Sequence, residues 1–335
     1  MKPKELVTMK PKALVMEPRG IELITRYKRN YSIPNEVQIT EDMVLAHWEL
    51  EKDLTKELLE SNSENRWEVF ERAYTKLYSK LQQQNPLLQE NRQTLETKDE
   101  NLDKYETWIQ IIGSPPKKIY EIGSGRGEMI AYFAQCGFEC KATEITKERG
   151  SKYVTEASPC LSWGNSDGVH LDNFEQTEFY DLVVSNQVIE HLHPEDLIVH
   201  FKSAYKILIK QGRYIFTTPH CHTGPHDISA IFGYDNPKGM HLKEYTYKEL
   251  SDSLKLAGYK YIYCAVPAKI KKILSVLGIK KEEQITAIGV FYLNMMLMVE
   301  NILFAIPIKK VRRFFSRLLR KVYLFADNIF LVAQK

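Results

Sequence analysis

The sequence predicts an α/β protein built on a doubly wound, mostly parallel sheet of seven strands. Two observations predict this fold class. From residue 117 onward, short β-prone runs alternate with helical stretches, and a glycine-rich turn follows the first of these runs. Such alternation gives a parallel sheet with helices on both faces. The length of 335 residues and the apolar content of 44% fit a folded protein with one large domain or two smaller ones.

Two parts precede the predicted sheet. Residues 1–40 open on an imperfect repeat, in which Met-Lys-Pro-Lys occurs twice, and we expect them to form a flexible leader. Residues 41–104 predict an N-terminal helical extension, because apolar residues recur at helical spacing. We expect two helices here, packed on a domain that occupies residues 105–335.

The predicted sheet and its covering helices follow in order along the chain. The seven predicted strands are Lys118–Ile122, Glu139–Thr143, Cys160–Trp163, Asp181–Ser185, Arg213–Thr217, Lys260–Ala265 and Ile329–Ala333. The four predicted helices are Glu128–Cys136, Lys147–Glu156, Pro194–Leu208 and Tyr247–Ala257. Gly258 directly follows the last of these helices and is a typical helix stop.

Residues 268–321 depart from this alternation and form a basic, amphipathic helical insertion before the last strand. They hold twelve Lys and Arg residues against three Glu, and residues 285–308 are strongly apolar. Glu300 interrupts the apolar stretch, and a charge at mid-membrane is costly, so we do not predict a transmembrane helix. Two interpretations stay open. The insertion caps its own domain with its apolar stripe, or it makes peripheral contact with a membrane.

Net charge and cysteine content limit the partners and the cellular compartment that we expect for the protein. The net charge is +3, which gives no case for a nucleic-acid partner. The five cysteines are odd in number and include no Cys-x-x-Cys pair, so we expect a reduced, cytoplasmic setting, with the membrane alternative at the cytoplasmic face. We expect no signal peptide, because the basic first residues build no apolar core.

The segment Lys118–Glu128 carries the most specific motif in the chain. Three glycines stand at alternate positions, Gly123, Gly125 and Gly127, between a predicted strand and a predicted helix. Glycine permits positive φ and leaves no Cβ between the backbone and a nucleotide-like ligand. A dinucleotide fingerprint needs Gly-x-Gly-x-x-Gly, and Glu128 stands where its third glycine belongs. The spacing therefore disfavours a nicotinamide dehydrogenase.

Three further motifs follow the glycine loop Tyr120–Gly127 along the chain. They are Ala142–Glu144, Gly164–Asp167 and Tyr180–Leu192. With these segments, Lys117–Lys335 resembles class I S-adenosylmethionine-dependent methyltransferases of the broad group that includes the ubiquinone and menaquinone biosynthesis enzymes. A further block, Gly224–Asp227 with His241–Thr246, resembles a bacterial and archaeal subgroup. The resemblance implies a Rossmann-like methyltransferase fold and S-adenosylmethionine as the cofactor.

The resemblance also implies which residues hold that cofactor. The glycine loop would approach its methionine part, and Glu121 would lie near its amino-acid end. Glu144 would accept both ribose hydroxyls, although a solvated strand end is the alternative for this residue. Asp167 could accept from the adenine amino group, and Asn186 and Gln187 would lie where the sulfonium meets the acceptor. The predicted set is Glu121, Gly123, Ser124, Gly125, Gly127, Glu144, Ser166, Asp167, Asn186 and Gln187.

Methyl transfer to a hydroxyl needs a base, and histidine is the usual one. His226 and His241 follow the fifth predicted strand, where the acceptor lid of such folds lies, and His191 follows the fourth. We predict His226 as the leading candidate, with His191 and His241 next, against the alternative that each is a structural hydrogen-bonding residue.

The run His220-Cys221-His222 has residue types that suit zinc. Adjacent residues on an extended chain point to opposite faces, so these side chains cannot easily share one ion. We therefore predict no metal site. A magnesium site at Glu190 with an acceptor diol is a weaker alternative.

The sequence thus predicts a methyltransferase that modifies a hydroxyl on a small molecule, a glycan or a lipid-linked acceptor. A non-catalytic scaffold of the same fold at a membrane or partner surface is the alternative. Nucleic-acid methylation is disfavoured, because Ser185–Val188 does not match the Asn-Pro-Pro-Tyr exit of base-flipping enzymes.

Overall fold

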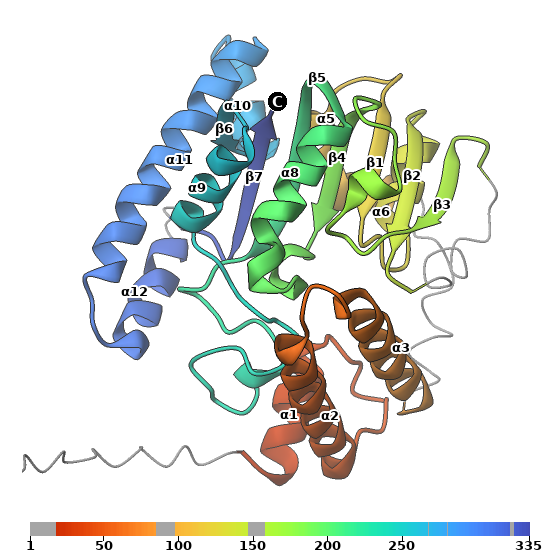
Figure 1. Cartoon of the computed structure of the whole chain (residues 1–335). Helices are drawn as coiled ribbons and strands as arrows, with labels where there is room; N and C mark the ends of the chain where they lie inside the picture. Colours follow the sequence, from red (N-terminus) through yellow and green to blue (C-terminus); the bar gives the residue numbers. More distant parts are fainter. Residues whose placement is uncertain (1–17, 85–97, 147–157, 267, 280, 322–324) are drawn as a thin grey trace, which may run out of the picture.

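The computed structural model describes residues 18–84, 98–146, 158–266, 268–279, 281–321 and 325–335. These residues form one seven-stranded sheet in the order β3-β2-β1-β4-β5-β7-β6 (Figure 1). The strands are β1 (Lys118–Ile122), β2 (Glu139–Glu144), β3 (Leu161–Asn165), β4 (Tyr180–Asn186), β5 (Leu208–Pro219), β6 (Tyr261–Cys264) and β7 (Asn328–Gln334). Strand β7 runs antiparallel to both β5 and β6, and the other pairs are parallel. The predicted fold class is confirmed, and each predicted strand overlaps an observed one.

Helices cover both faces of the sheet (Figure 1). They are α1 (Gly20–Asn30), α2 (Glu41–Glu60), α3 (Arg66–Gln84), α5 (Lys98–Ile112), α6 (Glu128–Gln135), α8 (Leu197–Ile207), α9 (Tyr247–Ala257), α10 (Ala268–Val276), α11 (Glu282–Phe304) and α12 (Lys309–Lys321). Short 3₁₀ turns lie at η1 (Leu171–Asn173), η2 (Ile189–His191), η3 (Pro194–Asp196) and η4 (Ile228–Ala230). Helices α8, α9 and α11 pack on one face, and α5 and α6 pack on the other.

The central strands are apolar on both faces, as strands covered by helices on both sides must be. Successive side chains of β4 alternate between the two cores: Val183 joins the core under α8 and α9, and Val184 joins the core under α5 and α6. Both side chains are fully buried. Burial of this kind fixes the register, because a slip by one residue would exchange the two faces.

Two predicted boundaries near the N-terminus are wrong. Residues 20–30 form α1 rather than part of a flexible leader, and Leu23 and Tyr27 of this helix are buried. The Tyr27 hydroxyl bonds Nδ1 of His47 at 2.8 Å, which ties α1 to α2. The boundary predicted at residue 104 falls inside α5.

Two of the four predicted helices match observed helices closely. Glu128–Cys136 and Tyr247–Ala257 match α6 and α9. The first turn of the predicted helix Pro194–Leu208 is the 3₁₀ turn η3. The predicted helix Lys147–Glu156 lies outside the described residues.

Helices α1 to α3 lie across the end of the sheet where the parallel strands finish (Figure 1). Trp48 of α2 stacks on Phe232 with ring centroids 4.8 Å apart. Arg66, the first residue of α3, pairs with Glu195 and Asp196 ahead of α8. Ligands of open α/β sheets bind at the carboxyl ends of the strands. The N-terminal helices therefore form a wall of the region where a ligand would bind.

The insertion divides into an inner and an outer part. Leu293, Met296 and Leu303 of α11 are buried against β6 and α9, so the cap interpretation holds for this face. It does not hold for the outer side of α12, where Phe314 and Leu318 are 64% and 49% exposed, although Leu319 on its inner side packs against the core.

Candidate active site

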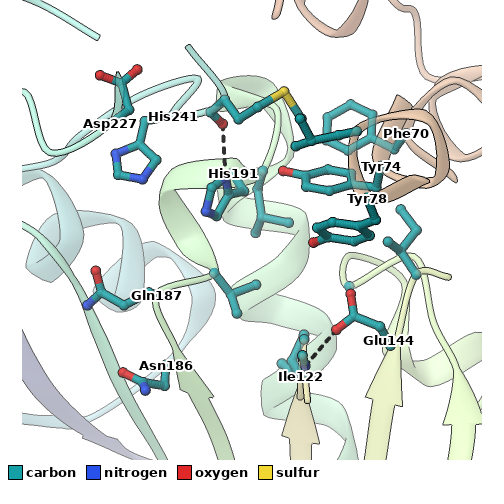
Figure 2. A pocket seen from close by; sticks show the side chains of 18 of the residues that line it. Phe70, Tyr74, Tyr78, Ile122, Glu144, Asn186, Gln187, His191, Asp227 and His241 are labelled. Carbon is teal, nitrogen blue, oxygen red and sulfur yellow. Dashed lines mark hydrogen bonds between the residues drawn. The ribbon is translucent and has the colours of Figure 1, made fainter. Parts of the chain in front are cut away.

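A cavity of about 410 Å³ lies at the carboxyl ends of β1, β2 and β4 (Figure 2). Three parts of the chain line it: the strand ends, the segment after β5, and the N-terminal helices. Residues from the predicted cofactor set that line it are Gly123, Gly125, Glu144, Ser166, Asp167, Asn186 and Gln187. All three predicted base candidates, His191, His226 and His241, line it too. Glu121, Ser124 and Gly127 of the predicted set do not.

The glycine loop adopts a backbone that only glycine accommodates easily. Gly123 has φ of +63°, and a Cβ on it would stand 2.7 Å from Cγ2 of Val188. Gly125 has φ of +56°, and a Cβ there would meet open space. Its N–H donates to Oε2 of Glu144 at 2.8 Å. The loop thus holds the β2 carboxylate against the floor of the cavity and leaves room above Gly125 for a ligand.

Glu121 is buried at the end of β1 next to the glycine loop and does not line the cavity. It is 3% exposed, and its Oε2 has no hydrogen-bond partner among the described residues. Burial, with the charge of Glu144 added, raises the pKa of Glu121 to about 8. An orphaned buried carboxylate next to a glycine loop suits a nearby cationic group, such as the amino end of S-adenosylmethionine.

Asp167 and Ser166 have local partners in the turn after β3. Oδ1 of Asp167 accepts from the N–H groups of Val169 and His170, each at 2.8 Å, and Oδ2 lies 2.7 Å from Nδ1 of His170. Oγ of Ser166 accepts from the N–H of Gly168 at 3.0 Å. The adenine role of either residue stays a prediction, and the geometry gives Asp167 a loop-shaping role.

The exit of β4 is strained at a predicted site residue. Gln187 has φ of +58°, a left-handed conformation that costs a non-glycine residue about 1–2 kcal/mol. Its Nε2 donates to Oγ1 of Thr217 at 3.1 Å, and that hydroxyl donates to Oδ1 of Asn186. Strain held in place by neighbouring bonds is common where a side chain must be presented to a ligand.

A carboxylate orders two of the three histidines. Oε1 of Glu244 accepts from the backbone N–H of His226 at 2.6 Å and lies 3.0 Å from Nδ1 of His241. Oε2 of Glu244 lies 3.3 Å from Nδ1 of His226, and Nε2 of His226 lies 3.1 Å from Oγ1 of Thr223. Both ring nitrogens of His226 therefore have protein partners. For His241, the carboxylate fixes Nδ1 as the protonated nitrogen.

His191 is held differently. Its Nδ1–H donates to the carbonyl of Met240 at 2.9 Å, drawn as a dashed line in Figure 2. Its ring lies edge-on to that of His241 with centroids 4.9 Å apart.

The charges of Glu244, His241 and Glu190 shift one another's pKa values. Burial alone would raise the pKa of Glu244, but its hydrogen bonds to His226 and His241 lower it to about 2. Burial alone would lower the pKa of His241, and its bond to Glu244 with the charge of Glu190 raises it instead. Burial raises the pKa of Glu190 to about 7 against the opposing charge of His241. The carboxylates of Glu244 and Glu190 therefore favour the protonated form of His241.

Two groups have metal-ligand types within reach of one another. Ligand atoms of Glu190, His191 and His241 all lie within 4.8 Å of each other, and this group could hold a divalent cation. His220, Cys221 and His222 meet the same criterion. Nδ1 of His220 accepts from the N–H of His222, however, and its Nε2 bonds Glu300, so His220 has no ring nitrogen left for an ion.

Sequence reasoning missed the aromatic wall that α3 contributes. Phe70, Tyr74 and Tyr78 line the cavity and lie opposite His191 in Figure 2. Tyr74 is buried, its ring meets that of His191 edge-on at 6.1 Å, and its hydroxyl has no partner among the described residues. Burial raises the pKa of Tyr74, so the phenol keeps its proton. The signal was present, because aromatic residues four apart share one face of a helix.

The sheet with an antiparallel last strand, the glycine loop after β1 and the carboxylate ending β2 define a class I methyltransferase that uses S-adenosylmethionine. A family model described as a methyltransferase domain matches residues 88–263, just over half of the chain, and the chain belongs to this family. No curated protein matches it.

The chain is also similar to several solved structures, at low identity and with TM-scores below 0.5. A SAM-dependent methyltransferase from Archaeoglobus fulgidus is 18% identical, with 74% of this chain and 98% of that chain covered and a TM-score of 0.46. The 1,6-didemethyltoxoflavin-N1-methyltransferase of Burkholderia thailandensis is 12% identical, with 82% and 91% covered and a TM-score of 0.46. Phosphoethanolamine N-methyltransferase 2 of Haemonchus contortus is 13% identical, with 70% and 52% covered and a TM-score of 0.41. The acceptors that these names contain are the substrates of those enzymes and say nothing about the acceptor of this chain.

Proposed function

We propose that this methyltransferase transfers the methyl group of S-adenosylmethionine to a hydroxyl on a small molecule, a glycan or a lipid-linked acceptor. One observation carries the proposal: a single cavity is lined both by predicted cofactor residues and by His191, His226 and His241. The cofactor supplies a methyl group already activated by a positive sulfur. The protein must align the acceptor, exclude water and take up the hydroxyl proton.

The geometry favours His241 over His226 as the base. The Glu244 carboxylate fixes the proton of His241 on Nδ1, which leaves Nε2 as the nitrogen that can accept a proton. In His226 the corresponding nitrogen is engaged by Thr223. The pKa of His241 is raised in the free protein. A positive charge bound in the cavity would lower that pKa again and restore the basic form.

The other wall of the cavity suits an acceptor with a ring or an apolar part. Phe70, Leu77 and Met240 are apolar, and the Tyr74 hydroxyl is a buried donor aimed at the cavity in Figure 2. Apolar walls with a few placed polar groups are typical of small-molecule sites. This supports a quinol-, phenol- or lipid-type acceptor, and membership in the ubiquinone and menaquinone group stays a prediction. The five free cysteines support a reduced, cytoplasmic setting.

Label transfer tests the proposal. The protein is incubated with methyl-labelled S-adenosylmethionine and with aqueous and lipid extracts of its source cells, and Gly125→Arg serves as the control because its side chain would fill the cavity floor. We expect label in one fraction in a form stable to mild alkali, as a methyl ether is. Label released as methanol would show a carboxyl acceptor and overturn the hydroxyl assignment. Binding of S-adenosylhomocysteine without any transfer would favour the scaffold alternative.

Matched histidine variants then test the base. His241→Gln should lower kcat by about 10²–10⁴-fold, the usual contribution of a general base, with cofactor affinity unchanged. His226→Gln should have a smaller effect on kcat. The reverse order would return the base to His226.

A further inference from the structure

The insertion presents an apolar surface that the described part of the chain does not cover. Val311, Phe314, Phe315 and Leu318 of α12 recur at the spacing of one helix face, and Phe314 is 64% exposed. On α11, Phe291 and the side chains about two and three turns beyond, Met298 and Ile302, are also exposed. Figure 1 places both helices at the edge of the molecule, beyond β6 and α9. Groups of exposed apolar side chains on a folded protein commonly mark an interaction site.

The inward side of α12 is fixed to the protein by basic residues. Nη2 of Arg312 donates to the carbonyl of Ile306 at 2.8 Å, and Arg313 pairs with Asp235 at 3.4 Å. Ser316 on the same side is fully buried. Leu319 packs against the core on this side as well. The stripe of Val311, Phe314, Phe315 and Leu318 therefore faces away from the domain.

A second set of basic residues runs along the edge of that stripe. Lys310, Arg317 and Lys321 are exposed and stand seven and four residues apart, which keeps them on one flank of α12. None of the three forms an ion pair with a residue that the structure describes. Helix α12 itself contains no acidic residue.

We propose that α12, with the outer face of α11, docks on the surface of a bilayer that contains anionic lipid. An amphipathic helix with a basic flank lies in the plane of the interface, with its apolar side chains among the acyl chains and its cations at the headgroups. The charge of the flank is complementary to anionic headgroups. The proposal goes beyond the methyl transfer described above and does not depend on the acceptor.

Helix α11 lies on this surface and does not cross the bilayer. Its length and composition alone would allow a span, and 33% of its apolar stretch is buried inside the protein. Glu300 is 4% exposed, accepts from the N–H groups of Tyr247 and Lys248 at 2.6 and 3.1 Å, and pairs with His220 at 2.5 Å. These bonds lie at the N-terminus of α9, whose dipole favours a carboxylate. Spanning would break them and carry Glu300 into hydrocarbon.

Vesicle flotation of the full chain tests the proposal. We expect binding to vesicles of phosphatidylcholine with phosphatidylserine, little binding to phosphatidylcholine alone, and release by high salt. The triple variant Lys310→Gln/Arg317→Gln/Lys321→Gln should bind about a hundredfold more weakly, since each basic residue contributes about fivefold near an anionic surface. The pair Phe314→Ser/Leu318→Ser should weaken binding as well.

A charge-matched control separates the flank from net charge. Lys76→Gln/Lys80→Gln/Lys202→Gln removes the same three charges from exposed positions on α3 and α8 and should leave binding unchanged. S-adenosylhomocysteine affinity should be the same in every variant, which shows that each is folded. Equal loss in the control, or no binding to anionic vesicles, would overturn the proposal. Resistance to alkaline extraction would show a membrane span and overturn the proposal. A dimer that is dissociated by Phe314→Ser/Leu318→Ser would show a protein interface and would overturn it as well.

Discussion

Glu144→Ala should weaken the affinity for S-adenosylhomocysteine, and the structure sets the expected size of the effect. Glu144 ends β2, and the bond from Gly125 N–H to its Oε2 at 2.8 Å fixes the carboxylate beside the glycine loop. A hydrogen bond to a charged group is worth about 1.5–3 kcal/mol, and the predicted role gives this carboxylate two ribose hydroxyls. Because the side chain is partly exposed, we take about 2–4 kcal/mol for the pair, or about 30- to 1000-fold in Kd.

Isothermal titration with S-adenosylhomocysteine measures this effect. Glu139→Ala is the matched control, because Glu139 is an exposed acid at the opposite end of the same strand. Circular dichroism melts of both variants check that β2 is still folded. If Glu144→Ala binds within about threefold of the wild type, a difference under 1 kcal/mol, and melts normally, the cofactor does not use this carboxylate and the reasoning fails.

Two further predictions concern stability. The pKa of Glu121 is raised to about 8, so the folded protein binds the proton of this carboxyl group more tightly than the unfolded chain does. This contribution to stability is lost as the pH rises from about 4.5 to 8. Glu121→Gln should therefore flatten the fall in melting temperature across that pH range, and an unchanged slope would contradict the raised pKa. A Cβ on Gly289 of α11 would stand 2.6 Å from the Cys264 carbonyl. Gly289→Val should therefore lower the free energy of unfolding, measured in urea, by about 1–3 kcal/mol. Val290→Ala, at the exposed neighbouring position, should not lower it. Equal effects of the two changes would mean that α11 does not pack as closely on β6 as described.

Local pattern was enough to predict the sheet. Strand β1, its glycine loop and α6 follow from a β-prone run, three glycines and a helical stretch that are contiguous in sequence. Residues 20–30 show the limit of such reasoning. Their helix is stabilised by burial of Leu23 and Tyr27 against α2 and the segment around Phe232, and those partners are distant in the chain.

The candidate site divides in the same way. The resemblance implied the residues at the strand ends, and the fold brings them together because the carboxyl ends of parallel strands meet at one edge of a sheet. The ranking of the histidines depends on tertiary structure. The fold brings Glu244 to His226 and His241, and it places the Thr223 hydroxyl against the second ring nitrogen of His226. The aromatic wall of α3 likewise comes from a segment about a hundred residues before β4.

The sequence by itself determined the class of protein, because the glycine spacing, the carboxylate after β2 and the alternation of strands and helices are local properties of the chain. It left open which side of the insertion faces outward. The tertiary structure decided this through Glu300, whose buried bonds to Tyr247, Lys248 and His220 fix the rotation of α11. With that face buried and Arg312 and Arg313 bound inward, the apolar stripe of α12 is left exposed, and no periodicity in the sequence could have shown which face the fold would cover.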